Sequence, residues 1–209
     1  MTYQMGILKL CLMIILSSGC DRTPKRESEI QKRKPDFILA LQPYKGFDTS
    51  LNSFIKKETE QFYNCRVIIL EPVVLPPSAF YAPRNRYRAD SLLDYEKTLI
   101  SRGVEAIAGL TDKDISTTSG NIQDWGVFGL GLKPGNVCVI STFRLQSTTA
   151  KQFRERLIKV VLHEIGHNLG LPHCKNNPEC LMTDAAGTMS QVDREKKWIC
   201  EKCQIRLNG

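Results

Sequence analysis

The 209-residue sequence has no apolar run long enough to cross a bilayer, no internal repeat and only three histidines. The apolar run near the N-terminus, residues 10–16, is far shorter than the ~20 residues that a membrane-spanning helix needs. The missing repeat excludes solenoid and propeller architectures. With 42% hydrophobic and 24% charged residues, the composition is that of an ordinary globular domain that is long enough to bury a core.

The net charge of +7 is unevenly distributed. Residues 21–35 contain six basic and three acidic side chains, and with Lys9 they carry +4 of the total. Residues 36–209 are therefore close to neutral for their length. This distribution favours a basic arm near an anionic membrane surface over a nucleic-acid-binding domain, whose charge would lie on the folded face.

The N-terminus is typical of an export signal. A short apolar run is followed by Ser17, Ser18, Gly19 and Cys20, and small residues before a defined position mark a cleavage site. The stretch resembles a bacterial lipoprotein signal with Cys20 as the lipidated residue; an ordinary secretory signal is the alternative. We therefore expect a signal peptide over residues 1–19, a lipid-anchored disordered linker over 20–35, and a location in the bacterial cell envelope, facing the periplasm or the exterior.

Hydrophobic patterning predicts an α/β fold for residues 36–209. Apolar runs at 36–43 and 65–72 flank an amphipathic segment at 48–63 with Asp48 as its N-cap, and such a strand–helix–strand unit favours parallel pairing. From residue 149 the apolar spacing changes to three and four, which predicts a long helix that ends at Gly170. The other expected elements are a proline-rich loop at 73–87, helices at 88–101 and 192–199, a strand at 104–115, and two strands within 125–145 joined by a KPGN turn.

All three histidines lie in one motif that begins at His163. His163 and His167 are four residues apart, so both imidazoles lie on one helix face and can converge on one cation. Glu164 is rotated by about 100° and flanks the metal without binding it. Gly170 lets the chain turn back, so that His173 becomes a third ligand and the fourth position stays open. The pattern H-E-x-x-H-x-x-G-x-x-H is the metzincin metalloprotease signature.

This motif predicts hydrolysis of peptide bonds by a zinc-activated water, with Glu164 as general base and then general acid. A non-catalytic, zinc-stabilised envelope binding lipoprotein is the alternative, but a structural zinc site has no use for Glu164. A zinc-ribbon nucleic-acid binder is disfavoured because the region around Cys200 and Cys203 is only mildly basic and the chain is expected to be exported.

Four cysteines follow the motif, namely Cys174, Cys180, Cys200 and Cys203. Two cysteine pairs separated by a loop predict a structural zinc site with four thiolate ligands. Disulfides are the alternative, because exported thiols tend to oxidise. The isolated cysteines at 65 and 138 are expected to be buried in the core, with a mutual disulfide as the second possibility.

The order of these residues resembles that of the archaemetzincins. In that family the motif is followed at once by a cysteine, then a second cysteine, x-Met, seventeen residues and CxxC. Here Cys174, Cys180, Met182, Cys200 and Cys203 match, except that five residues separate the first two cysteines where the family usually has four.

The resemblance implies a compact metzincin-like zinc peptidase domain with a mixed twisted sheet, an active-site helix and a C-terminal segment stapled by zinc. It implies two zinc ions, one catalytic and one structural, and a Met-turn at Met182, with Met189 as the competing candidate. We expect a peptide or protein substrate that pairs with an edge strand at 126–130 or 136–142, and a monomer.

Overall fold

The structure is a computed structural model that describes residue 1 and residues 37–208. The predicted signal peptide, apart from its first residue, the lipidation at Cys20 and the linker over 20–35 lie outside the described residues. Among the described helices, none is both long enough and apolar enough to span a membrane.

A five-stranded sheet forms the centre of the domain, in the order β2-β1-β5-β9-β8. Four strands are parallel, and β8 pairs antiparallel with β9 at one edge. The predicted strand–helix–strand unit is confirmed, because β1 and β2 are parallel neighbours. The strands are β1 (Ile38–Pro43), β2 (Arg66–Ile69), β5 (Ala106–Thr111), β8 (Gly129–Gly131) and β9 (Val137–Ser141).

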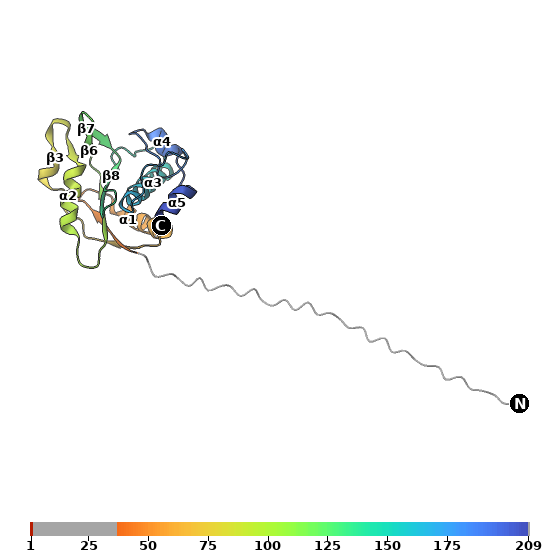
Figure 1. The fold of residues 1–209 in the computed structure, drawn as a ribbon. Helices are drawn as coiled ribbons and strands as arrows, with labels where there is room; N and C mark the ends of the chain where they lie inside the picture. The colour runs from red at the N-terminus through yellow and green to blue at the C-terminus, as the bar shows by residue number, and fades with distance from the viewer. Residues whose placement is uncertain (2–36, 209) are drawn as a thin grey trace. The chain divides into compact units, whose positions relative to one another are not determined.

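Helices cover both faces of this sheet (Figure 1). Along β1, Leu39 and Leu41 join the core with α1 (Asn52–Tyr63) and α3 (Ala150–Asn168), whereas Ala40 joins the core with α2 (Ala89–Leu99). The alternation follows from the two-residue period of a strand. Burial on both faces explains why these strands have continuous apolar runs.

The long helix α3 has the predicted ends. The Thr149 side chain accepts a hydrogen bond from Gln152 N at 3.2 Å and caps the start of the helix. Gly170, with φ +88°, lets the chain leave its other end. The prediction for 48–63 needs a correction, because Asp48 caps the 3-10 turn η1 (Thr49–Leu51) and α1 begins only at Asn52.

A second sheet lies beside the first, in the order β3-β4-β6-β7. The proline-rich stretch at 73–87 is therefore not a plain loop. The predicted strand at 104–115 is two strands, and the region 125–145 contributes to three, with the KPGN turn between β8 and β9 as predicted. The elements are η2 (Pro77–Ala79), β3 (Phe80–Tyr81), η3 (Ala82–Arg84), β4 (Arg86–Arg88), β6 (Ile115–Ser119) and β7 (Ile122–Val127).

The predicted helix at 192–199 is wrong. The structure has α4 (Met189–Arg194) and α5 (Glu201–Asn208), with a non-helical segment between them. That segment bonds back to the chain around Cys180: Lys196 N donates to Glu179 O at 2.9 Å and Leu181 N donates to Trp198 O at 2.8 Å. These long-range hydrogen bonds outweigh the helical preference of the local sequence.

Candidate metal centres

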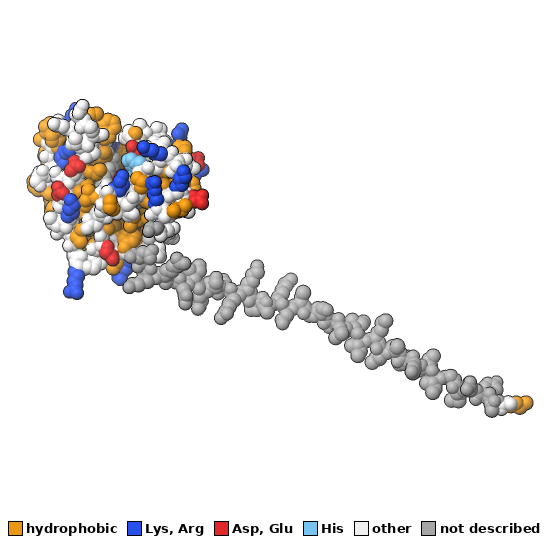
Figure 2. Space-filling model, viewed as in Figure 1, with side chains coloured by type: hydrophobic (Ala, Val, Ile, Leu, Met, Phe, Trp, Pro, Cys, Tyr) orange, Lys and Arg blue, Asp and Glu red, His pale blue; other side chains and the backbone are white. Residues whose placement is uncertain are grey.

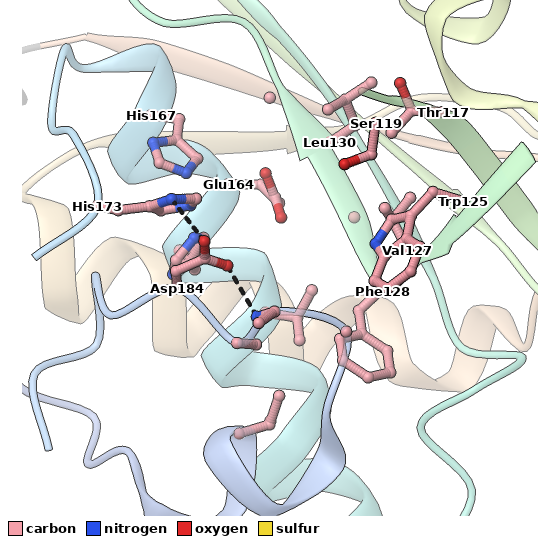
Figure 3. Close-up of a pocket in the computed structure, with 18 of the residues that line it drawn as sticks. Thr117, Ser119, Trp125, Val127, Phe128, Leu130, Glu164, His167, His173 and Asp184 are labelled. Carbon is pink, nitrogen blue, oxygen red and sulfur yellow. Dashed lines mark hydrogen bonds and ion pairs between the residues drawn. The ribbon is translucent and has the colours of Figure 1, made fainter. Parts of the chain in front are cut away.

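The three histidines converge at one end of α3 (Figure 3). His163 and His167 project from neighbouring turns of the helix, and His173 returns from the segment after Gly170. Each residue offers a ring nitrogen that lies within 4.8 Å of the other two. His173 is exposed, and the histidine side chains are visible at the surface in Figure 2. The cluster is therefore open on one side, as a catalytic metal site requires.

Each imidazole has a partner for its Nδ1 atom. His163 Nδ1 lies 2.7 Å from Leu181 O, and His167 Nδ1 lies 2.7 Å from Leu171 O. His173 Nδ1 lies 3.3 Å from an Asp184 carboxylate oxygen. Such partners fix the ring orientation and leave each Nε2 atom for a metal.

Burial keeps the inner histidines neutral. It lowers the pKa of His163 to about 3 and also lowers the pKa of His167. Only the neutral imidazole has a lone pair for a metal, so this environment favours the form that can bind zinc.

Glu164 faces the edge strand β8. A Cβ added at Gly129 would lie 2.6 Å from Glu164 Cγ, and one added at Gly131 would lie 2.7 Å from Glu164 O. The two glycines therefore allow β8 to approach α3 closely. Burial raises the pKa of the Glu164 carboxyl to about 8, and a hydrogen bond from Gly131 N–H acts in the opposite direction.

Met182 lies directly against the helix that carries the histidines. It is fully buried, and a Cβ added at Gly166 would lie 2.6 Å from its sulfur. Its carbonyl accepts a hydrogen bond from Cys174 N at 2.6 Å. Met189, the competing candidate, lies in α4 and is only partly buried.

The four C-terminal cysteines form a second cluster, in which all the sulfur atoms lie within 4.8 Å of one another. The distances are 3.6 Å for Cys174–Cys200, 3.6 Å for Cys200–Cys203 and 3.9 Å for Cys180–Cys203. Tetrahedral zinc with Zn–S bonds of about 2.3 Å separates its sulfurs by about 3.8 Å. Each cysteine is free in the structure, and the sulfur atoms are too far apart for S–S bonds of about 2 Å. The spacing of the cluster fits zinc, and no disulfide joins the four cysteines in this structure.

The pocket at the histidines has a volume of about 540 Å³. Trp125 and Phe128 lie across it from the histidines and Asp184 (Figure 3). A Cβ added at Gly187 would lie 3.2 Å from the Trp125 ring, so β7 and the segment after Asp184 come into contact beside the pocket.

Comparison with known proteins identifies the family to which this fold and site belong. Residues 73–209 match peptidase family M54. The chain belongs to this family. The archaemetzincin of Halobacterium salinarum is 35% identical over 151 residues, which cover 68% of this chain and 83% of that protein. The archaemetzincin of Archaeoglobus fulgidus is 31% identical over 147 residues, which cover 70% and 84% of the two chains.

Solved archaemetzincin structures have the same fold. The structure from Methanopyrus kandleri matches with a TM-score of 0.73 and 27% identity, covering 84% of this chain and 96% of that one. A malonate complex from Archaeoglobus fulgidus matches with a TM-score of 0.70 and 27% identity, covering 81% and 99%. This member of the family is therefore a zinc metallopeptidase with the predicted α/β metzincin-like fold.

Sequence reasoning missed residues that support the candidate site. No local pattern indicated that Asp184 bonds His173 or that Gly131 bonds Glu164, because both contacts join distant segments. One of the two predicted edge segments is also wrong, since β9 lies between β5 and β8 in the sheet interior. The edge is β8, which falls largely within the other predicted segment, 126–130.

The isolated cysteines are both buried and free. Cys65 and Cys138 belong to the core that packs against α1 and α3. The interpretation as small core residues is confirmed, and neither forms the alternative disulfide in this structure.

Proposed function

We propose that His163, His167 and His173 hold a catalytic zinc ion and that Glu164 transfers the protons of peptide-bond hydrolysis. The observation that carries the proposal is the convergence of three imidazoles, each with its Nδ1 engaged, beside a buried carboxylate. Zinc supplies Lewis acidity at such a site, since it polarises a peptide carbonyl and makes water acidic near neutral pH.

Glu164 is positioned to move one proton through the reaction. Its carboxylate accepts the proton of the attacking water, and the same group donates a proton to the departing amine. The Gly131 N–H bonds the carboxylate and holds it in place beside the histidines. No side-chain nucleophile takes part.

We propose a structural zinc ion at Cys174, Cys180, Cys200 and Cys203, for a total of two zinc ions. Two of the sulfurs accept hydrogen bonds from backbone N–H groups: Asn176 N lies 3.4 Å from Cys174 Sγ, and Cys200 N lies 3.3 Å from Cys180 Sγ. Such bonds stabilise thiolates, which are the form that binds zinc. Met182 is our candidate for the methionine beneath the catalytic site, supported by its contact with Gly166.

The proposed substrate is a peptide or protein that adds a strand to β8. This strand is one of the two edges of the central sheet, and it also lines the pocket. An extended peptide can hydrogen-bond along the outer side of such an edge strand, apart from the Gly131 N–H, which bonds Glu164.

We further propose that Cys20 anchors the enzyme by lipid to a membrane of the bacterial cell envelope. The lipoprotein-like signal and the basic stretch that follows it support this location. Replacing Cys20 with Ala should move the protein from the membrane fraction to the soluble fraction. Retention on the membrane would contradict the anchor without affecting the proposed chemistry.

The decisive test of the catalytic proposal is Glu164→Gln. Because the amide cannot carry the proton, hydrolysis of a broad peptide library should fall by about 10²–10⁴-fold. Zinc content, measured by mass spectrometry of metals, should stay at the wild-type value. Asp94 is exposed, and Asp94→Asn serves as a control that should leave both peptide hydrolysis and zinc content unchanged. Wild-type protein that binds zinc but cleaves no peptide would favour the alternative, a non-catalytic binding lipoprotein.

A further inference from the structure

The pocket has an apolar side next to Glu164. Val160 lies one helical turn before Glu164, and it lines the pocket together with Phe128, Ala185 and Val192. These four residues belong to the same hydrophobic cluster. The walls beside the candidate general base are therefore suited to the aliphatic part of a substrate side chain.

A carboxyl group also lines this pocket. Glu195 follows α4 and is only 6% exposed. It lines the pocket at the histidines and also a second cavity of about 770 Å³ between α1, α3 and the end of α4. Glu195 therefore lies between the two cavities.

The Glu195 carboxylate is poorly partnered for a buried group. Gln191 Nε2 lies 3.4 Å from Oε1, and the same nitrogen donates a shorter bond of 2.8 Å to Pro178 O. The Lys159 ammonium group bonds backbone carbonyls at the end of α4, including Glu195 O at 2.9 Å. Within the described residues, no Lys, Arg or His nitrogen lies within 4.0 Å of this carboxylate.

Burial raises the pKa of Glu195 to about 7, which reflects the cost of its charge in this environment. The nearby Lys159 charge acts in the opposite direction, but its ammonium group bonds backbone carbonyls and not this carboxylate. A buried carboxylate without a cation in direct contact gains from a charged hydrogen-bond donor. Such a donor can come from a substrate, because the group lines the substrate pocket.

We propose that Glu195 is a specificity-determining residue that selects Lys or Arg at one position next to the scissile bond. The aliphatic stem of such a side chain matches the apolar walls, and its cationic end matches the carboxylate. A neutral side chain of equal length would leave Glu195 unpaired, so the discrimination is expected to be strong. This inference rests on the proposed peptidase function.

The test compares peptides that differ at a single position. Cleavage of a peptide library by the full-length, zinc-loaded enzyme identifies the positions that flank the cut. Matched peptides then carry Lys, Arg, norleucine or Glu at the enriched position. We expect kcat/KM for Lys and Arg to exceed that for norleucine by at least about tenfold, and the Lys-to-norleucine ratio to fall about tenfold in Glu195→Gln.

Glu155→Gln is the matched control, because Glu155 lines the second cavity but not the pocket at the histidines. It should leave the ratio unchanged. Equal rates for Lys and norleucine in the wild-type enzyme would overturn the proposal. A second outcome would also overturn the proposal. If the preference for Lys or Arg peptides survives removal of the side-chain charge but disappears when the peptide N-terminus is acetylated, the enzyme recognises the terminal ammonium group and not the side chain.

Failure of the proposed function is distinguishable from failure of this inference. If the wild-type enzyme cleaves no peptide, the catalytic proposal fails. Binding of the same peptides to Glu164→Gln protein, followed by fluorescence anisotropy, still tests the role of Glu195. Tighter binding of the Lys peptide would support the inference, and equal affinity for the Lys and norleucine peptides would overturn it.

Discussion

Two glycines of β8 set the distance between the edge strand and Glu164. The sequence GLG leaves no Cβ where the strand passes the helix, and the Gly131 N–H bonds the carboxyl group. A side chain at either position would displace Glu164 or the strand. The proposed general base is therefore positioned by two residues that have no side chain, and their role depends on the absence of a Cβ atom.

We predict that Gly129→Ala lowers kcat/KM by about 10²-fold, which is the effect of moving a catalytic group by about 1 Å. The added Cβ would come within 2.6 Å of Glu164 Cγ, so the carboxylate must shift. Peptide hydrolysis and zinc content are measured on the same preparation. A variant with wild-type turnover would show that Glu164 tolerates the displacement.

Asp184 is the partner of the most exposed zinc-ligand candidate. Replacing Asp184 with Ala removes the carboxylate 3.3 Å from His173 Nδ1, so the ring loses its orientation. Zinc affinity, measured by competition with a chelator, should fall by about 10–100-fold. Asp112→Ala, which removes a carboxylate paired with Lys113, should not change the affinity. An unaltered affinity in Asp184→Ala would mean that His173 needs no partner.

The segment from Cys180 to Met182 joins the two clusters. Cys180 belongs to the sulfur cluster, Leu181 O accepts from His163, and Met182 packs beneath the helix. His173 and Cys174 are also consecutive in the chain. Two of the three imidazoles are therefore held by segments that the cysteine cluster fixes.

We predict that Cys203→Ser weakens metal binding at both clusters. Loss of the proposed structural ion should loosen the Leu181 carbonyl, and the affinity of the histidines for zinc should fall by about tenfold or more. Chelator titration with two resolved steps measures each site separately. Cys65→Ala is the control, because Cys65 lies in the core outside the cluster. A Cys203→Ser variant with full affinity at the histidines would show that the two sites are independent.

At the scale of the whole molecule, the core beneath α2 contains a buried acid. Glu96 is fully buried and accepts a hydrogen bond from Tyr44 at 3.0 Å. A Cβ added at Gly109 would lie 1.8 Å from Glu96 Oε1, so the carboxyl group lies directly on β5. Burial raises the pKa of Glu96 well above its ordinary value.

This shift predicts how stability depends on pH. In the unfolded chain the Glu96 carboxyl group has a pKa of about 4.3 and ionises above that pH. In the folded protein it stays protonated to a higher pH. The stability that Glu96 contributes to the fold is therefore fully present below its pKa in the unfolded chain. It is lost as the pH rises toward the pKa in the folded protein. Glu96→Gln should unfold at a higher temperature relative to wild type at pH 8 than at pH 5, by calorimetry. A difference that does not depend on pH would contradict this assignment.

The C-terminal region marks the limit of local patterns. Residues 192–199 have a helical composition, yet the backbones of Lys196 and Trp198 bond back to the chain on either side of Cys180. The proline-rich stretch at 73–87 contributes two short strands because β6 offers a partner for β4. Such pairings depend on segments that are distant in sequence, and the local spacing carries no information about them.

The sequence by itself determined the metal-binding residue types, the helix that carries His163 and His167, and the parallel start of the sheet, because these follow from periodicities of a few residues. The tertiary structure decided that β8 and not β9 is an edge strand, and that Asp184, Leu181 and Gly131 orient the site. It also brought Glu195 to the wall of the pocket. These contacts join segments that are far apart in the chain. They depend on tertiary packing, about which the local order of residues carries no information.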